Sequence, residues 1–458
     1  MAEFTRFNLK SIEDLNSELK RLDLNLPVSA DTSVLGSSIS CGGIELPNRF
    51  VVQPMEGIDA DEAAGAPSEL TFRRYRRFAE GGAGLIWFEA AVVEPEGRSN
   101  PRQLLINREN LDVWKRLVDQ TREAARLRHG HEITTVLQIS HSGRWSKPYG
   151  KPVPVIVHRN PELDAALKLD GDYPLISDDD VARLRDLHIS CGELAVEAGF
   201  DGVEMKAVHG YFAGETLCAR GRGGRYGGSY ENRTRFVREC AEGLVARLGG
   251  GGFVTARLTM HEPSAYPYGW GTEESEGSKV LMLDEPLRFA SELVELTDMP
   301  FINFSIGYPR FAPYMNRPFN NPIAGGSIPP EHPLEGIVRF QQVGRELQKR
   351  LGDTPVITAA LGWLRHLMPE VAAGLVNEGW VKLIGQGRQS FAYPESPADV
   401  MKTGGMDASK CCISCSLCSQ IMKDVEGRNG CPVRDGGIYR AELQKGRKAA
   451  AAKDLPDE

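Results

Sequence analysis

The sequence has no uninterrupted run of about 18 apolar residues, so no helix of membrane-spanning length is expected. Its first twenty residues are charged and contain no apolar segment of the kind that a secretory signal needs. The net charge is −8 and no dense run of lysine and arginine occurs, which argues against a nucleic-acid surface. We therefore expect a cytoplasmic protein with neither nucleic-acid nor membrane partners.

A second absence concerns nucleotide binding. No Gly-x-Gly-x-x-Gly pattern occurs in the 458 residues, although a dinucleotide-binding open sheet would show it after a strand. From about Leu46 to about Gly387 there is instead a regular alternation of short β-rich runs and amphipathic helices. Eight strands with intervening helices predict an α/β fold, the (β/α)8 barrel, with a doubly wound open sheet as the alternative.

The predicted strands are Phe50–Gln53, Leu85–Glu89, Thr134–Ile139, Gly202–Lys206, Phe253–Leu258, Phe301–Ser305, Val356–Ala359 and Val381–Ile384. The helices between them are predicted at Ser68–Ala79, Leu111–Arg128, Asp178–Ala198, Thr234–Leu248, Pro286–Leu296, Leu334–Arg350 and Pro369–Glu378. Two connections, Ser142–Leu175 and Gly307–Gly336, are longer than turns, and such loops usually build an active site or its lid.

The chain is predicted to have four parts. Residues 1–40 form an N-terminal arm with one helix, from about Ser11 to Leu22, and residues 41–394 form the barrel. Residues 395–440 are a cysteine-rich segment, and residues 441–458 are a charged, alanine-rich tail.

Five of the nine cysteines lie within 21 positions near the C-terminus. Four follow the pattern Cys412-x2-Cys415-x2-Cys418-x12-Cys431. Three close thiolates can wrap one face of a cube while a distant fourth closes the remaining corner, as a [4Fe-4S] cluster requires. A four-cysteine zinc site is the alternative, although zinc ribbons usually pair two Cys-x2-Cys knuckles. Cys411 is a spare thiol and an alternative ligand to Cys412.

Several further stretches occur in a fixed order: Asn48-Arg49-Phe50 with Pro54-Met55, Glu89-Ala90 with Pro95-Glu96-Gly97-Arg98, Leu137 to Arg144, His209-Gly210-Tyr211, Tyr226 to Arg233, and Gly385 to Arg388. Over about residues 40–435 this order and spacing resemble the Old Yellow Enzyme family of FMN-dependent (β/α)8 barrels. With the cysteine run, the chain is similar to the iron–sulfur branch that includes 2,4-dienoyl-CoA reductase and trimethylamine dehydrogenase. The resemblance favours the cluster over zinc.

The resemblance also assigns a set of residues at strand C-termini to FMN. Its members are Pro54, Met55, Glu56, Ala90, Gln138, Arg257, Ala360, Leu361, Gly362, Gly387 and Arg388. It implies that Gln138 contacts the pyrimidine edge of the flavin and that Arg257 stabilises the anionic reduced flavin beside N1 and O2. Backbone amides after the seventh and eighth strands, together with Arg388, would hold the phosphate.

On the substrate side the family shows His or Tyr, two residues, His, and then Gly-Tyr. This chain has Lys206-Ala207-Val208-His209-Gly210-Tyr211. The match implies that His209 donates a hydrogen bond to the activating oxygen of the substrate and that Tyr211 transfers the proton opposite the hydride. The plainer readings are a satisfied core histidine and a tyrosine hydroxyl bonded in the pocket wall.

Three positions depart from the family pattern. Lys206 replaces the first His or Tyr, and would bind a substrate carboxylate or enolate, serve as a base if desolvated, or form a salt bridge to an acid such as Glu204. Glu56 stands where relatives carry Cys, Thr or His, which excludes a cysteinyl–flavin bond and makes the FMN noncovalent. It also disfavours the anionic reduced flavin unless it is protonated or pairs with a cationic substrate. Pro309 stands where dienoyl reductases place a catalytic histidine, which counts against a dienoyl-CoA substrate.

We therefore expect an enzyme that transfers hydride between FMN N5 and an activated C=C bond of a small molecule. The relatives with a cluster usually continue into a further nucleotide-binding half. The electrons would here come from a partner protein through the cluster, or from NAD(P)H visiting the FMN. The first alternative is an N-methyl amine dehydrogenase or demethylase, and the second is a non-redox barrel with a zinc-stabilised docking tail. Because relatives are often dimers, a homo-oligomer is expected by analogy.

Overall fold

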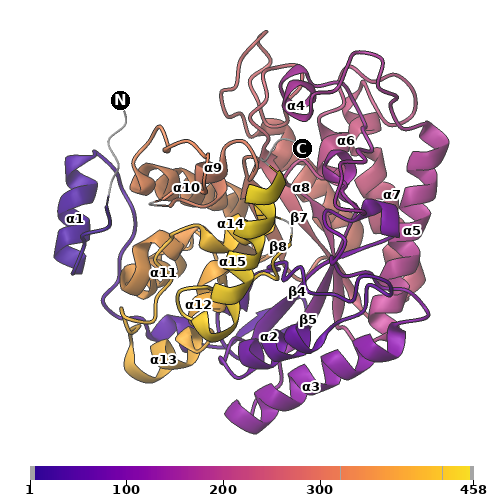
Figure 1. Ribbon diagram of the computed structural model, residues 1–458. Helices are drawn as coiled ribbons and strands as arrows, with labels where there is room; N and C mark the ends of the chain where they lie inside the picture. The colour runs from indigo at the N-terminus through magenta and orange to yellow at the C-terminus, as the bar shows by residue number, and fades with distance from the viewer. Residues whose placement is uncertain (1–5, 320, 425, 454–458) are drawn as a thin grey trace.

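The computed structural model describes residues 6–319, 321–424 and 426–453, and it contains the predicted barrel. Eight strands close into a ring in the order β10-β3-β4-β5-β6-β7-β8-β9, and every neighbouring pair is parallel (Figure 1). The strands are β3 (Phe50–Val52), β4 (Leu85–Val92), β5 (Thr134–Ser140), β6 (Gly202–Ala207), β7 (Phe253–His261), β8 (Ile302–Ile306), β9 (Val356–Thr358) and β10 (Leu383–Gln386). Their C-terminal ends therefore share one rim, where barrel enzymes place their active sites.

Amphipathic helices cover the outside of the ring, as expected. They are α2 (Glu69–Ala79), α3 (Leu111–His129), α5 (Asp178–Glu197), α7 (Tyr230–Leu248), α8 (Asp284–Thr297), α10 (Pro333–Leu351) and α11 (Met368–Asn377). Helix α5 illustrates the local signals, because the Ser177 side chain accepts from the Asp180 amide and three aspartates fill the first turn. Helix α7 begins in the same way at Ser229 and ends at Gly249 with a left-handed φ of 53°.

The opposite end of the barrel is closed by a small antiparallel hairpin, β1 (Ile39–Cys41) and β2 (Ile44–Leu46). Cys41 and Leu46 are buried in a core cluster with Trp87 of β4 and other strand residues. The N-terminal arm before the hairpin carries α1 (Ile12–Arg21) and the short turn η1 (Ser33–Gly36). Leu15 of α1 is fully buried in the main core, so the arm is part of the packed body.

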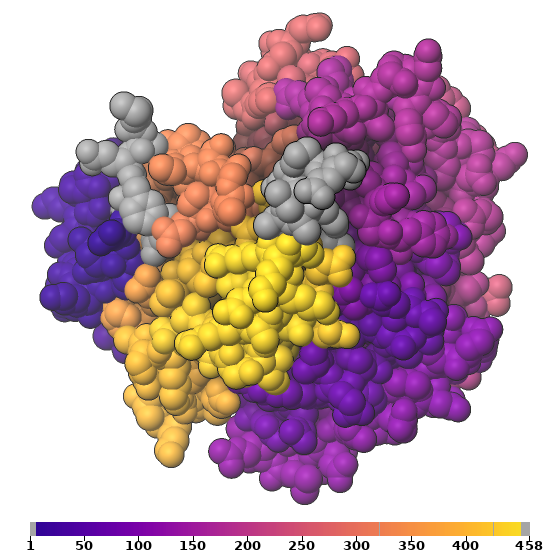
Figure 2. All heavy atoms as spheres, viewed as in Figure 1, coloured from indigo at the N-terminus to yellow at the C-terminus, as the bar shows by residue number. Residues whose placement is uncertain are grey.

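The remaining helices lie in the long loops and after the barrel. They are η2 (Pro95–Gly97), η3 (Gly143–Trp145), α4 (Pro161–Leu167), α6 (Phe212–Leu217), α9 (Pro313–Asn316), η4 (Leu361–Leu367), α12 (Arg388–Ala392), α13 (Ser396–Thr403), α14 (Leu417–Asp424) and α15 (Gly436–Lys453). The segment near the C-terminus covers one face of the molecule, shown in yellow in Figure 2. Within the described ranges, no helix has both the length and the apolar character needed to cross a bilayer.

Four predicted boundaries were wrong by three residues or more. Helix α7 begins at Tyr230 and not at Thr234. Strand β4 continues to Val92 through an irregularity between Phe88 and Ala91, so Ala90 lies inside the strand and not after it. Strand β7 continues to His261, so Arg257 lies at its middle. The last helix begins at Gly436, before the predicted start of the tail.

Candidate active site

A belt of polar side chains crosses the interior of the barrel. The amide of Gln138 donates to Glu204 over 2.5 Å, and Asn303 donates to Glu204 and to Gln53 over 3.3 and 2.9 Å. All four side chains are almost fully buried. Burial raises the pKa of Glu204 to about 7, opposed by the nearby charge of Arg257.

Arg257 and Gln138 retain hydrogen-bonding capacity toward the rim. The Nε of Arg257 is buried without a partner among the described residues, and burial lowers the pKa of its guanidinium. Gln138 uses its amide nitrogen toward Glu204, which leaves its carbonyl oxygen and one N–H. The pyrimidine edge of a flavin needs hydrogen-bond donors and an acceptor. The Nε–H of Arg257 and the remaining amide groups of Gln138 can supply them, so these residues fit the implied cofactor.

Apart from Ala90, which lies inside β4, the other residues predicted to hold FMN lie at the same rim, in the turns after β3, β9 and β10. A Cβ built on Gly387 would lie 3.0 Å from the sulfur of Met55, so these two turns touch. Ala360 has a left-handed φ of 68°, and Gln341 of α10 pins this turn by donating to the carbonyl of Ala359. A Cβ on Gly362 would meet no atom within 4 Å, so the backbone is open there. Pro54 directly precedes Met55, and Leu361 lies between Ala360 and Gly362.

Lys206, Glu56 and Tyr211 meet on the substrate side of the rim. The Lys206 ammonium lies 2.8 Å from Oε1 of Glu56 and 3.9 Å from the centre of the Tyr211 ring. The Lys206 and Glu56 side chains are 6% and 8% exposed, so this is a buried ion pair. The salt-bridge alternative for Lys206 is therefore correct in kind, but the partner is Glu56 and not Glu204. The second oxygen of Glu56 has no partner among the described residues.

His209 and Tyr211 are presented by a tight turn at the end of β6. His209 and Gly210 both have positive φ, 66° and 64°. Burial, with the charges of Arg257 and Lys206, holds the pKa of His209 well below its usual range, so the ring is neutral. Its Nε2 lies 3.2 Å from the hydroxyl of Ser305.

Glu262, directly after β7, fixes this turn by a hydrogen bond. Its Oε1 accepts the Gly210 amide over 3.2 Å, and its Oε2 has no partner among the described residues. The side chain is fully buried, and burial raises its pKa to about 8. Glu262 is therefore a protonated positioning group at neutral pH, and the sequence offered no motif that would have found it.

Aromatic side chains from the two long loops form a wall beside Tyr211. Trp145 of the first loop and Tyr308 of the second are buried in one cluster with Tyr211 and Leu163. Both long loops therefore reach Tyr211 through these two residues, and their role as an active-site wall stays a prediction. Farther along the second loop, Phe319 packs under Arg317 at 5.0 Å and lies away from this wall.

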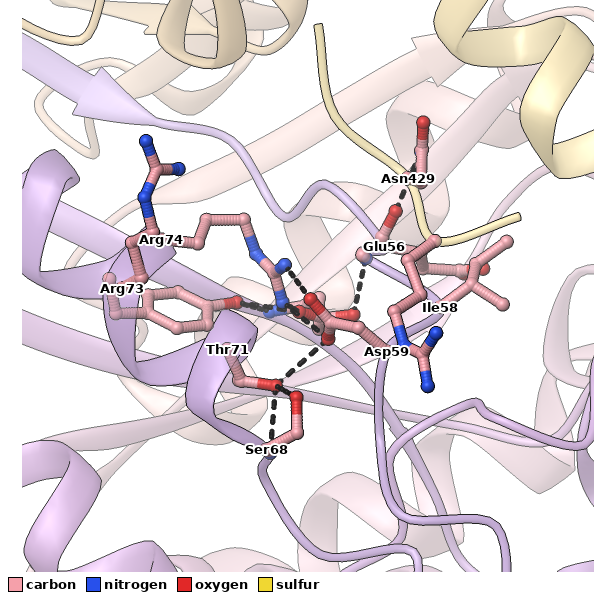
Figure 3. A network of polar contacts seen from close by, with 12 residues as sticks. Glu56, Ile58, Asp59, Ser68, Thr71, Arg73, Arg74 and Asn429 are labelled. Carbon is pink, nitrogen blue, oxygen red and sulfur yellow. Dashed lines mark hydrogen bonds and ion pairs between the residues drawn. The ribbon is translucent and has the colours of Figure 1, made fainter. Parts of the chain in front are cut away.

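A buried charge network fixes the segment that carries Met55 and Glu56. Arg74 of α2 forms ion pairs with Asp59 and with Glu89 of β4, and Glu89 accepts the Gly57 amide over 2.6 Å (Figure 3). A Cβ on Gly57 would collide with the Arg74 guanidinium at 2.1 Å, so only glycine fits. The cysteine-rich segment adds a further contact.

That contact comes from Asn429, two residues before Cys431. The side-chain amide of Asn429 donates to the backbone carbonyl of Glu56 over 2.8 Å (Figure 3). Its backbone N–H donates to the carbonyl of Gly57 over 2.6 Å. The turn after β3 therefore lies directly between the barrel mouth and the cysteine-rich segment.

The structure brings the four predicted cysteines together. Cys412, Cys415, Cys418 and Cys431 line one cavity, and each is partly exposed. Cys411 is fully buried, donates its thiol to the carbonyl of Asp407 and does not line this cavity. Cys412 is thus the ligand candidate of the two. Within the described ranges, no three His, Cys, Asp or Glu side chains gather closely enough to hold a single metal ion.

Two arginines stand beside the thiols. Arg388 lines the cavity and donates to Ser419 over 2.9 Å, so its guanidinium faces the cysteines; its predicted contact with the FMN phosphate stays a prediction. Arg317 donates to Ser416 over 2.9 Å, and burial with the charge of Arg388 lowers its pKa to about 9. Neither forms an ion pair with a described carboxylate. Arg317 comes from the long loop after β8, and no motif there marks it as a functional residue.

A sequence model described as the NADH:flavin oxidoreductase / NADH oxidase family matches residues 36–297, more than half of the chain. The chain belongs to this family. The assignment confirms the resemblance drawn from the motifs and the predicted class, an FMN-dependent oxidoreductase. It sets aside the non-redox barrel.

An NADH oxidase of Thermoanaerobacter brockii is 27% identical over 384 residues, 82% of this chain and 52% of that protein. The chain thus spans about half the length of this curated relative. A solved complex of 2-naphthoyl-CoA reductase has a TM-score of 0.68 at 19% identity, covering 92% of this chain and 58% of that one. The 6-hydroxypseudooxynicotine amine oxidase of Pseudomonas geniculata N1 has a TM-score of 0.66 at 17% identity, covering 93% and 56%. These two structures share the fold.

Proposed function

We propose that this protein reduces an electron-poor C=C bond of a small molecule and exchanges electrons through a [4Fe-4S] cluster. Bound noncovalently at the rim, FMN would supply the hydride, and the cluster would supply single electrons. One of the two structural neighbours is a reductase and the other is an amine oxidase. The choice between these reactions therefore rests on the residues of this chain.

The observation that carries the proposal is the cationic character of the substrate side. The Lys206 ammonium stands over the Tyr211 ring, and Lys206 and Arg257 are the two charges that act on His209. Hydride addition to a C=C bond conjugated with a carbonyl places negative charge on the oxygen. Fixed cations and a neutral imidazole donor stabilise that charge and disfavour a protonated amine.

Each residue on the substrate side then has a role. His209 donates a hydrogen bond to the oxygen of the activating group, and Lys206 supplies positive charge beside it. Hydride adds to one carbon of the double bond, and Tyr211 gives its phenolic proton to the other carbon. Together they add two hydrogens across the bond. Glu56 neutralises Lys206 before substrate enters, which keeps a buried ammonium from standing alone.

The cluster proposal rests on the cavity that the four cysteines share. A cubane presents its irons at separate corners and needs thiolates set around a space, as Cys412, Cys415, Cys418 and Cys431 are. Arg317 and Arg388 are half-buried cations beside the thiols, and the anionic cluster would neutralise them. We propose an electron-carrier protein as the partner at the cluster, with NAD(P)H as the other source of electrons. All nine cysteines are free thiols, which suits a cytoplasmic location.

Amine oxidation is the second candidate, and one observation favours it. The second oxygen of Glu56 is buried without a partner among the described residues, and it would accept a hydrogen bond from a substrate ammonium. Lys206 opposes this reading, because it already occupies the first oxygen and repels a second cation.

Anaerobic stopped-flow absorption separates the two reactions. We expect 2-cyclohexenone or cinnamate to reoxidise the reduced flavin, and we expect trimethylamine to leave the oxidised flavin unchanged. Bleaching by the amine without reoxidation by either alkene would overturn the assignment to C=C reduction.

A further inference from the structure

The stretch that runs from the cysteines into α15, residues 407–448, has a charge opposite to that of the whole chain. Residues 407–448 contain eight Lys and Arg against five Asp and Glu, whereas the whole chain contains 54 against 62. The protein is therefore acidic overall, with a basic segment around the cysteine cavity. An uneven distribution of this kind steers oppositely charged partners to one face.

The cavity reaches the surface within this basic segment. Among its lining residues, Ile413 and Val433 are partly exposed and Arg434 is exposed. The Arg434 guanidinium donates to the carbonyl of Cys411 over 3.1 Å, which holds it at the edge of the cavity. A small apolar spot with a cation beside it thus lies over the cysteines.

Two of the acids of this segment are already paired with cations of the chain itself. Asp435, next to Arg434, forms ion pairs with Arg73 and Arg77 of α2 at 2.7 and 2.6 Å. Glu442 accepts the Arg428 amide over 2.8 Å and pairs with its guanidinium at 3.9 Å. Asp435 and Glu442 are therefore already engaged and do not pair with the exposed cations of α15.

Helix α15 extends the basic surface away from the cavity. Its buried side, with Tyr439, Leu443 and Gly446, packs on the body. Its exposed side carries cations that form no ion pair with a described carboxylate: Arg440, Lys445, Arg447 and Lys448. Arg440, Arg447 and Lys448 follow the spacing of one helix face, so the charge forms a line. This part of the chain makes up the yellow face in Figure 2.

We propose that this basic face, formed by Arg434 and the exposed cations of α15, docks an acidic one-electron carrier protein. The carrier's redox centre would then lie over Ile413 and Val433, where the cysteine cavity comes to the surface. The proposal rests on the cluster proposed above, because a single-electron partner needs a single-electron centre beneath its docking site. Charge complementarity of this kind acts mainly on the rate of encounter and weakens as salt is added.

The test measures binding by calorimetry, with the purified holoenzyme and two probes of opposite charge. A plant-type ferredoxin is the acidic probe and cytochrome c is the basic one. The variant is Lys445→Glu with Arg447→Glu and Lys448→Glu, all exposed and outside the cavity lining. The control makes the same charge change on other faces, with Lys20→Glu, Arg128→Glu and Lys151→Glu, which are also exposed and without ion pairs to described residues.

We expect ferredoxin to bind wild type and the control with Kd values within twofold of each other, and to bind the α15 variant at least tenfold more weakly. The wild-type affinity should fall at least tenfold between 20 and 200 mM salt. Equal binding of ferredoxin to wild type and to the α15 variant, or tighter binding of cytochrome c than of ferredoxin, would overturn the proposal. Iron and flavin counts on the same samples report on the cluster independently, so failure of docking is distinguishable from failure of the proposed function.

Discussion

The cations at the barrel mouth lie beside carboxylates of the same chain, whereas the half-buried cations at the cysteine cavity do not. Lys206 pairs with Glu56, Arg257 lies near Glu204, and Arg74 holds two carboxylates. Arg317 and Arg388 donate only to serine hydroxyls among the described residues. The turn after β3 contacts both regions, yet the cations are paired with carboxylates in one region and not in the other.

The difference indicates what each region receives. A site whose charges are already paired can accept a neutral substrate and then respond to charge that develops during reaction. A site with uncompensated cations is suited to a ligand that arrives with negative charge, such as thiolates bound to iron. The predictions below alter one region at a time, in order of decreasing effect.

Removing a cysteine should have the largest effect. For Cys415→Ser we expect the iron content to fall from about four per chain to near zero, since a serine hydroxyl is a poor iron ligand. Transfer to a one-electron acceptor should be lost while FMN is retained. Iron and flavin assays measure both.

Cys411→Ser is the matched control for that change. Cys411 lies outside the cavity lining, so this variant should keep its iron. If Cys411→Ser lost iron and Cys412→Ser kept it, the assigned ligand set would be wrong.

Tyr211→Phe tests the proton donor at the barrel mouth. Loss of a positioned general acid should slow reoxidation of the reduced flavin by 2-cyclohexenone by about 10²- to 10⁴-fold. Reduction of the flavin by dithionite should be unchanged. An unaltered reoxidation rate in stopped-flow absorption would assign the proton to another group.

Lys206→Met tests whether Lys206 neutralises the buried charge of Glu56 at the barrel mouth. The single variant leaves Glu56 buried and unpaired, which should destabilise the fold by about 3–5 kcal/mol. Lys206→Met with Glu56→Gln should recover most of that loss, because no buried charge remains. Denaturant unfolding of wild type and both variants measures this, and equal stability of the two variants would contradict the pairing.

Glu262→Gln should have the smallest effect, which is a change in how the free energy of unfolding depends on pH. Because burial raises the folded pKa of Glu262 to about 8, the folded state keeps a proton that the unfolded state has lost. Its contribution to stability is complete at acidic pH and declines as pH rises toward 8, by about 1.4 kcal/mol per pH unit. Glu204 and Glu89 are raised only to about 7, so the variant should flatten the decline most clearly between pH 7 and 8.

The decline is measured as the free energy of unfolding at pH 5, 6, 7 and 8. A slope that is identical in wild type and Glu262→Gln would show that Glu262 is ionised in the folded state at pH 7.

Much of the barrel followed from the sequence because buried parallel strands are apolar runs of a distinctive length. All eight strands lie within about three residues of the predicted positions. The errors at Ala90 and Arg257 arose because a strand irregularity and a polar residue facing the interior leave no mark on local composition.

The charge pairs did not follow from the sequence. Glu204 is two residues from Lys206, but barrel closure brings in Glu56 from 150 residues away. Glu262 and Arg317 act through contacts that exist only after the loops fold, and neither lies in a motif. Spacing could propose the four cysteines as one set, because ligand geometry constrains local sequence directly.

The most direct test is the absorption spectrum of anaerobically purified protein, with iron and acid-released flavin counted per chain. The account predicts a yellow-brown protein with about one FMN and about four irons, since the cysteine cavity would hold one cubane. FMN without iron after reconstitution would leave the barrel mouth as described and contradict the role given to the cysteine cavity. Neither FMN nor iron would contradict the account as a whole.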